Sequence, residues 1–303
     1  MTTMRSVPNV LAAFVALLAS FASAPIGAQT PDTDIFVAEL RVVGGTVEIG
    51  APRNITSREG YDNQPWFIPD SEALLYAADV DGQTDIFEYD LATGERTRRT
   101  HTPENEFSPS RTMDGEMLAV RWAADMSDGH LWRYSADGTP LGAHAADVAR
   151  IGYYGVVDEM TMAAFVNDSA RSFVLADGRT GRRTKLGEGL GGSPPQRIPG
   201  EDAVSFVQPD EAGVAWIRRL DLATHKITPI AETLPDVVSY AWLPGGLLLM
   251  PHGNAIFVRD SRTDAGWREV ARFDDAALAL ITRIAVDATG DRIALVAARA
   301  ESR

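Results

Sequence analysis

The sequence contains no cysteine, and this absence excludes several kinds of chemistry at once. Without thiols the chain has no disulfides, no thiolate nucleophile or metal ligand, and no cysteine that could carry a lipid anchor. The fold must therefore be held together by its apolar core alone, which a length of 303 residues allows.

Basic residues are scarce relative to acidic ones. The chain has 28 Lys and Arg against 42 Asp and Glu, a formal net charge of −14. Binding of nucleic acid through its phosphates is excluded on this balance, and adhesion to an anionic lipid surface is disfavoured. The acidity suits a soluble protein and a partner with a basic patch, but it does not bear on the fold.

Long apolar runs are also lacking, apart from one near the start. The run from Val10 to Phe21 follows Arg5 and ends in small residues, the pattern of a cleaved export signal. We predict a signal peptide over residues 1–28, cleaved after Ala24 or Ala28, with an uncleaved anchor as the alternative. The run is shorter than the roughly 20 residues that span a bilayer, and no later run is long enough. The protein is thus expected to be periplasmic or secreted, of bacterial type, with no membrane span after cleavage.

Signatures of catalysis and metal binding are missing as well. The sequence has no His-Glu-x-x-His motif, no Gly-x-Ser-x-Gly elbow and no phosphate-binding loop. The five histidines are scattered, which favours structural or surface roles: His101, His130, His144, His225 and His252. We predict no catalytic residue, no metal ligand and no cofactor.

The segment "DVDGQTD", Asp79 to Asp85, has two interpretations. Its alternating carboxylates and glycine suggest a calcium loop, but Ala77 stands where such a loop needs an oxygen ligand. Asp-Gly is also the usual chemistry of a two-residue hairpin turn, and we favour the hairpin.

The organisation of the chain is a repeat. The unit Gln64 to Thr100 holds four short apolar segments separated by Pro-Asp, Asp-Gly and Thr-Gly turns, which predicts a four-stranded antiparallel meander. Pro65 recurs as Pro109, and "DLAT" at Asp90 to Thr93 recurs at Asp221 to Thr224. Five such units of about 40 to 45 residues follow one another, the period of a β-propeller.

The two ends of the chain complete a sixth unit. "TGDRIAL" near the C-terminus matches the first half of the unit and then stops, while "DIFVAEL" and "GTVEIGAPRNIT" near the N-terminus supply the missing strands. Closing the last blade from both termini removes the free sheet edge. We therefore predict an all-β, six-bladed propeller with four-stranded blades in one domain, a monomer, with two separate β-sandwiches as the alternative. The domain is expected over residues 32–299, with repeats at about 57–100, 101–147, 148–188, 189–233, 234–275, and 276–299 with 32–56.

The unit "QPWFIPDSEALLYAADVDGQTDIFEYDLATGERTRRTHT" resembles the WD-like repeat of the TolB-type propellers. Their pattern runs Pro-x-(Trp/Phe)-Ser-Pro-Asp-Gly, an apolar strand, Asp-Gly, and Asp-Ile-(Tyr/Phe). The resemblance implies an exported propeller in a family often used to bind proteins. The chain lacks the separate N-terminal domain of TolB itself, which puts a role in the Tol machinery in doubt, and it lacks the hydrolase domain of propeller-bearing prolyl peptidases.

Candidate binding residues lie where the chain enters the first strand of each unit. These positions meet around one end of a propeller's channel. Binding sites are commonly lined by polar and aromatic groups that converge in this way. The alternative is that they satisfy backbone groups in an ordinary wet channel. The candidates are Tyr61, Asp62, Asn63, Gln64, Glu104, Glu106, Tyr153, Tyr154, Gln196, Arg197, Tyr240 and Arg283.

The sequence therefore predicts a binding module for a protein or envelope component, acting through the channel mouth. The alternative is an enzyme on the same scaffold, a lactonase-like hydrolase or a sugar lyase with a channel metal. Only Asp62, Asn63, Glu104 and Glu106 could supply metal ligands, and they come from two of the six units.

Overall fold

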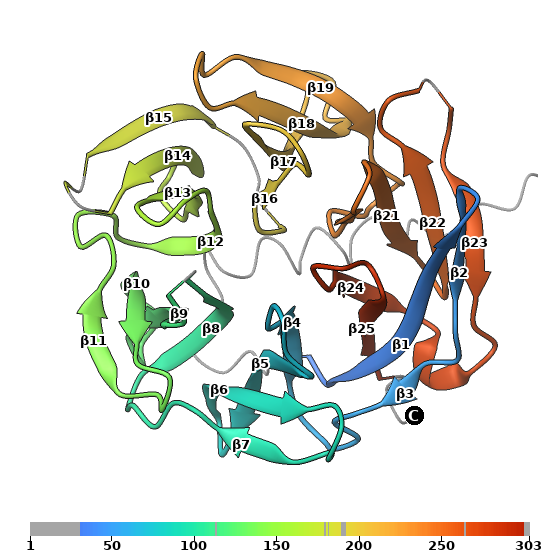
Figure 1. The fold of residues 1–303 in the computed structure, drawn as a ribbon. Coiled ribbons are helices and arrows are strands. Elements are labelled where there is room, and N and C mark those ends of the chain that lie inside the picture. The colour runs from blue at the N-terminus through green and yellow to red at the C-terminus, as the bar shows by residue number, and fades with distance from the viewer. Residues whose placement is uncertain are drawn as a thin grey trace, which may run out of the picture.

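The computed structural model describes residues 31–299, apart from 113, 179, 181, 189–191 and 264. In this part of the chain, six small antiparallel sheets stand around a central axis as the blades of a propeller (Figure 1). The expected all-β propeller is confirmed, and the alternative of two sandwiches does not hold. The signal peptide expected over residues 1–28 lies outside the described residues.

The first three blades follow one another along the chain. Blade 1 consists of β4 (Asp62–Phe67), β5 (Ala73–Val80), β6 (Gln83–Asp90) and β7 (Arg96–Arg98). Blade 2 consists of β8 (Asn105–Arg111), β9 (Met117–Trp122), β10 (Gly129–Tyr134) and β11 (Pro140–Ala143). Blade 3 consists of β12 (Ile151–Val156), β13 (Thr161–Val166), β14 (Ser172–Asp177) and β15 (Arg183–Glu188).

Two further blades and a short helical turn follow. Blade 4 consists of β16 (Gln196–Arg197), β17 (Ala203–Pro209), β18 (Ala215–Asp221) and β19 (Ile227–Glu232). Blade 5 consists of β20 (Ala241–Leu243), β21 (Leu247–His252), β22 (Ala255–Asp260) and β23 (Arg268–Arg272). A 3-10 turn, η1 (Ala276–Leu278), leads into the last blade, and Asp275 caps it by accepting from the Ala277 amide.

Blade 6 is built from both ends of the described chain, as the sequence predicts. Its inner strands are β24 (Ile281–Val286) and β25 (Arg292–Ala298), and its outer strands are β1 (Thr33–Val43), β2 (Thr46–Ile49) and β3 (Arg53–Asn54). β1 pairs antiparallel with β25, and both β2 and β3 pair with β1, so the fourth strand is broken into two pieces. Arg299 seals the junction through Nε and Nη2, which donate to the Asp34 carboxylate at 2.8 and 3.1 Å.

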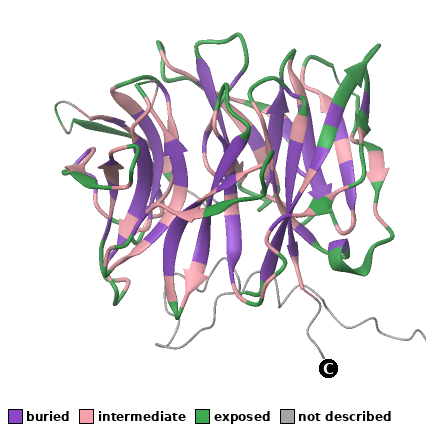
Figure 2. Ribbon diagram, turned by 60° about the horizontal axis from the view of Figure 1, so that its bottom comes forward, coloured by how far each residue is buried: buried purple, intermediate pink, exposed green. Residues whose placement is uncertain are grey.

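The second strand of each blade is buried on both faces, which explains the continuous apolar runs in the sequence. In β5, Leu74 and Tyr76 pack toward blade 6, while Leu75 and Ala77 pack toward blade 2. Each junction between neighbouring blades has its own apolar cluster of this kind. The burial colours of Figure 2 show the same division, with buried strands between exposed loops.

The Asp-Gly segment forms a hairpin, as favoured from the sequence. Val80 pairs with Gln83, and the two turn residues Asp81 and Gly82 have φ of 56° and 83°. Positive φ at both central residues is the type I′ geometry that Asp-Gly adopts at low cost. No helix long and apolar enough to cross a bilayer occurs in the described part of the chain.

Candidate functional site at one end of the channel

Arg283, near the start of β24, reaches across the channel. Its Nε donates to Oδ1 of Asn63 in blade 1 at 3.0 Å, and its Nη2 donates to the Tyr153 hydroxyl in blade 3 at 2.9 Å. The guanidinium carbon lies 5.3 Å from the centroid of the Tyr153 ring. Blades 3 and 6 stand on opposite sides of the ring (Figure 1), so this contact spans the channel. We call these three residues the channel bridge.

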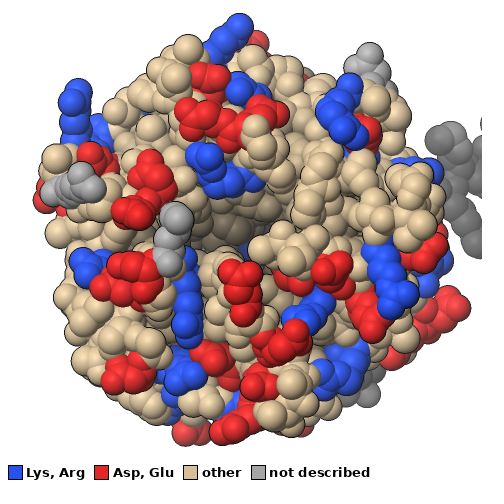
Figure 3. Space-filling model, in the orientation of Figure 1, with Lys and Arg blue, Asp and Glu red and all other residues tan. Residues whose placement is uncertain are grey.

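The channel bridge lies near one end of the channel. Ile281 pairs with Ala297 at the end of β25, so Arg283 sits toward the end of the ring where β25 ends. The structure brings three of the twelve candidates together there, namely Asn63, Tyr153 and Arg283. Figure 3 shows the opposite end of the ring, which is hollowed at its centre with acidic and basic side chains around the hollow.

Irregular pairing in the innermost strands decides which residues reach the channel. The register shifts beside Arg283 in β24 and beside Tyr153 in β12. A bulge interrupts the strict alternation of side chains along a strand. Tyr153 is consequently half-buried at the channel, whereas the next residue, Tyr154, is buried in the cluster between blades 2 and 3.

Gln64 connects blade 1 to blade 2. It has φ of 57°, and its Oε1 accepts a hydrogen bond from the Ser108 amide at 2.6 Å. The register of β4 shifts at this point, between Asn63 and Trp66. Gln64 therefore serves a backbone group of the neighbouring blade.

Tyr154, Tyr240 and Gln196 are ties between blades. The Tyr154 hydroxyl lies 2.7 Å from the Ser110 hydroxyl of blade 2, and the Tyr240 hydroxyl lies 2.8 Å from the Ser205 hydroxyl of blade 4. Gln196 Nε2 donates to the Tyr240 carbonyl at 2.7 Å. Both tyrosines are buried, so the structure places these three candidates in blade junctions and not together at the channel bridge.

A polar network occurs twice around the ring, at equivalent places. In blade 6 the Thr56 hydroxyl accepts from the Ile35 amide at 3.0 Å and donates to Asp34 at 3.2 Å. In blade 1 the Thr100 hydroxyl accepts from Ile86 at 2.8 Å and donates to Asp85 at 3.2 Å. The two "TDIF" segments of the sequence thus mark two copies of one structural device.

Asp62 and Glu106 occupy matching places beside the two networks, at the entry to β4 and β8. Both side chains are fully buried, and each has one oxygen without a hydrogen-bond partner. Asp62 accepts from Arg58 Nη2 at 2.8 Å, while Glu106 accepts from the Thr102 hydroxyl and from Tyr134 at 3.3 Å. Sequence reasoning missed Arg58, although a lone arginine four residues before a buried acid is a visible signal.

Burial dominates the electrostatics of these two carboxyls. It raises the pKa of Asp62 to about 6, against the opposing effect of the Arg58 guanidinium. It raises the pKa of Glu106 to about 7, with the hydrogen bond from Thr102 acting in the opposite direction. Near neutral pH both groups therefore carry an unfavourable charge in the folded state.

Three further candidates have partners outside the channel bridge. Arg121 Nε donates to Glu104 at 3.1 Å. Arg197 lies 3.7 Å from Asp202 in an exposed pair. Tyr61 is buried, and its ring meets that of Phe107 edge-on at 6.5 Å between centroids.

The ligand candidates for a channel metal do not form one group. Asp62 is paired with Arg58 and Glu104 with Arg121. Across the described ranges, no three His, Asp or Glu side chains gather as a metal site. These residues therefore do not fit a channel metal.

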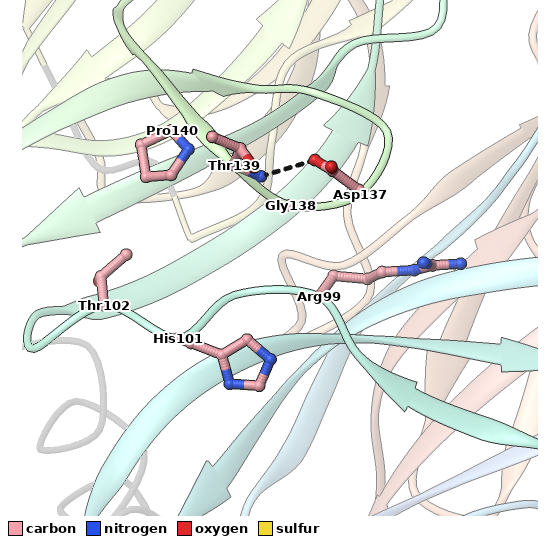
Figure 4. A pocket seen from close by; sticks show the side chains of 7 residues that line it. All are labelled: Arg99, His101, Thr102, Asp137, Gly138, Thr139 and Pro140. Carbon is pink, nitrogen blue, oxygen red and sulfur yellow. Dashed lines mark hydrogen bonds between the residues drawn. The ribbon is translucent and has the colours of Figure 1, made fainter.

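A cleft of about 260 Å³ lies between blades 1 and 2, and none of the predicted site residues lines it (Figure 4). Its walls are the segment after β7 and the turn between β10 and β11, with these lining residues: Arg99, His101, Thr102, Asp137, Gly138, Thr139 and Pro140. A Cβ on Gly138 would lie 1.6 Å from the Arg99 carbonyl oxygen, so only glycine fits this close approach. The cleft arises from the packing of two blades, which no sequence motif signals.

Glu106 predicts a dependence of stability on pH. Its folded-state pKa of about 7 lies above the ordinary value of 4.5, so the folded state holds this proton more tightly than the unfolded chain does. The stabilisation is complete below pH 4.5 and is lost as pH rises through about 7. Between pH 5 and pH 8 the free energy of unfolding should fall by on the order of 2 kcal/mol through this group.

Urea unfolding at the two pH values checks this prediction. Glu106→Gln should remove most of that pH-dependent loss, whereas Glu48→Gln, on the exposed face of β2, should leave it unchanged. Equal pH dependence in wild type and Glu106→Gln would refute the assignment to Glu106.

Comparisons with known proteins bear on the fold. No protein-family model matches the chain, and no curated protein does. A putative TolB from Agrobacterium tumefaciens is 13% identical with a TM-score of 0.64, covering 89% of this chain and 99% of that one. A chain of the nidogen/laminin complex is 13% identical with a TM-score of 0.60, covering 84% and 97%. An oligogalacturonate lyase in complex with manganese is 15% identical with a TM-score of 0.54, covering 84% and 82%.

At such identities the likeness concerns the fold alone, because one fold hosts many functions. It agrees with the resemblance of the repeat unit in blade 1 to the TolB-type pattern. The chain is therefore a six-bladed β-propeller of the same fold as the TolB structure.

Proposed function

We propose that this chain is an exported binding module that holds a protein or envelope component at the end of the channel marked by the channel bridge. The observation that carries the proposal is the meeting of Asn63, Tyr153 and Arg283 from three separate blades. A cation, an amide and an aromatic hydroxyl drawn together in a concave ring are groups that recognise a ligand. The apolar run at residues 10–21 supports export.

Protein binding is the favoured class of role. The other candidates mostly tie blades together, so hydrogen bonds between blades hold the rim in place. Rigid presentation of a few polar and aromatic groups favours association, since little ordering cost remains to be met on binding. Among solved structures of the same fold, one is a complex of nidogen with laminin.

Affinity capture from bacterial envelope extracts tests the proposal. The double variant Tyr153→Phe with Arg283→Gln removes the Tyr153 hydroxyl and the Arg283 charge, and it should recover at least fivefold less of the protein that wild type enriches. Asp62 and Glu106 are unsuitable for this test because both are buried and their loss would disturb the fold. Arg262→Gln is the matched control, since Arg262 is exposed on blade 5 and pairs with Asp260.

Equal capture by wild type and the double variant would show that the channel bridge does not bind the partner. Thermal unfolding of both variants verifies that they are folded. Metal analysis of the same preparations addresses the enzyme alternative, because a stoichiometric divalent ion that survives dialysis would favour a hydrolase or lyase over a binding module.

A further inference from the structure

We propose that Arg283 is an anion-binding group that receives a single carboxylate of the ligand inside the channel. The inference rests on the proposed function, in that the channel bridge is where the ligand binds. It adds the chemical class of the group that the ligand must present.

The guanidinium of Arg283 is only partly used by the protein. Arginine has five N–H donors, and here Nε donates to Asn63 and Nη2 to Tyr153. Both acceptors are neutral. Its Nη1 has no acceptor among the described residues and is not one of the fully buried atoms without a partner, so solvent reaches it.

Arg283 lacks the counter-ion that several other arginines at this end of the ring have. Arg58, Arg98, Arg121 and Arg299 each lie within 4 Å of a carboxylate. Within the described ranges, no Asp or Glu lies that close to Arg283. A partly desolvated cation without a partner is the natural receptor for an anion from outside, because the low dielectric strengthens such a pair.

The protein holds this cation in a fixed orientation. The Oδ1 of Asn63 also accepts from the Gln64 amide at 2.8 Å, which immobilises the acceptor of Arg283 Nε. The Tyr153 hydroxyl anchors the other side from across the channel. A pre-oriented guanidinium fork loses little side-chain entropy on binding, and it matches the planar geometry of a carboxylate.

Charge around the site limits the ligand to a small anionic group. The protein carries a formal charge of −14, which repels a polyanion approaching the ring. One unpaired cation can neutralise one negative charge. A single carboxylate, from a peptide terminus or an acidic side chain, fits these conditions better than a dianionic phosphate.

Titration with benzoate tests this inference, with isothermal calorimetry of the full chain at pH 7 as the measurement. Benzoate should bind saturably, and benzamide, its neutral isostere, should not. Arg283→Gln should weaken benzoate binding at least tenfold, while Arg262→Gln should leave it unchanged. Tyr153→Phe, which keeps the ring and frees Nη2, should retain benzoate binding.

Several results would overturn the inference. These are equal benzoate affinity in wild type and Arg283→Gln, saturable binding of benzamide, or inorganic phosphate binding more tightly than benzoate. If Arg283→Gln does not fold, Arg283→Lys decides instead, because loss of the planar fork should weaken benzoate binding at least threefold and an unchanged affinity would refute the role.

The two proposals fail in different ways. Loss of benzoate binding in Arg283→Gln with undiminished partner capture would leave the anion site standing and refute the proposed function. Partner capture that depends on Tyr153 and Arg283 while wild type shows no benzoate binding would refute the carboxylate site alone.

Discussion

Removal of residues 32–56 should abolish cooperative unfolding of the whole ring. This segment contributes β1, β2 and β3, and its loss exposes the full length of β25 as an unpaired edge. It also removes Ile35 and Phe36, buried side chains of the apolar clusters on the two sides of blade 6. Circular dichroism and calorimetry should show no single sharp transition, whereas deletion of a mere leader would leave the transition intact.

Point substitutions in β1 measure its contribution to stability without the wider disturbance that a deletion causes. Ile35→Ala should lower the free energy of unfolding by about 2 to 5 kcal/mol, because Ile35 is fully buried. Val43→Ala, on the same strand but 61% exposed, should change it by less than about 0.5 kcal/mol. Equal effects of the two substitutions would mean that β1 is not part of the core.

Phe206→Ala should be the most damaging single change in the junction between blades 3 and 4. The Phe206 ring is fully buried and stacks on Phe173 with centroids 4.1 Å apart, and Phe165 lies at 6.3 Å. Truncation leaves a cavity that its aromatic neighbours can only partly fill, at a cost of about 3 to 5 kcal/mol. The midpoint of thermal unfolding should fall by roughly 10 °C.

Two further variants serve as controls for the prediction on Phe206. Phe206→Leu keeps most of the volume and should cost less than half as much as the alanine variant. Val214→Ala, at an exposed position of the same blade, should be nearly neutral. A loss below about 1 kcal/mol in Phe206→Ala would contradict the stacking role.

The fold was predictable because similar turn residues recur at similar positions in successive sequence units. The turn at Asp81 and Gly82 predicts that the strands on either side of it pair as a hairpin. The complementary half-units at the two ends predict that those ends form one blade. The site was less predictable. Of the candidates at the entries to the first strands, Asn63, Tyr153 and Arg283 meet at one end of the channel.

The remaining candidates differ from that expectation for a physical reason. A strand alternates its side chains, but a bulge beside the channel sends neighbouring residues to different surroundings. Tyr153 and Tyr154 have the same chemistry and adjacent numbers, yet one joins the channel bridge and the other a blade junction. Pairing register is set by contacts between strands, and a single sequence does not display it.

The ion pair between Asp34 and Arg299 has a consequence for the timing of folding. These residues lie at opposite ends of the described chain, so the ring cannot be sealed until the last strand has left the ribosome. Until then β1 lacks β25, its partner toward the centre of blade 6, and closing so distant a contact is slow. A chain whose closure is postponed in this way exposes an open sheet edge for longer during its synthesis.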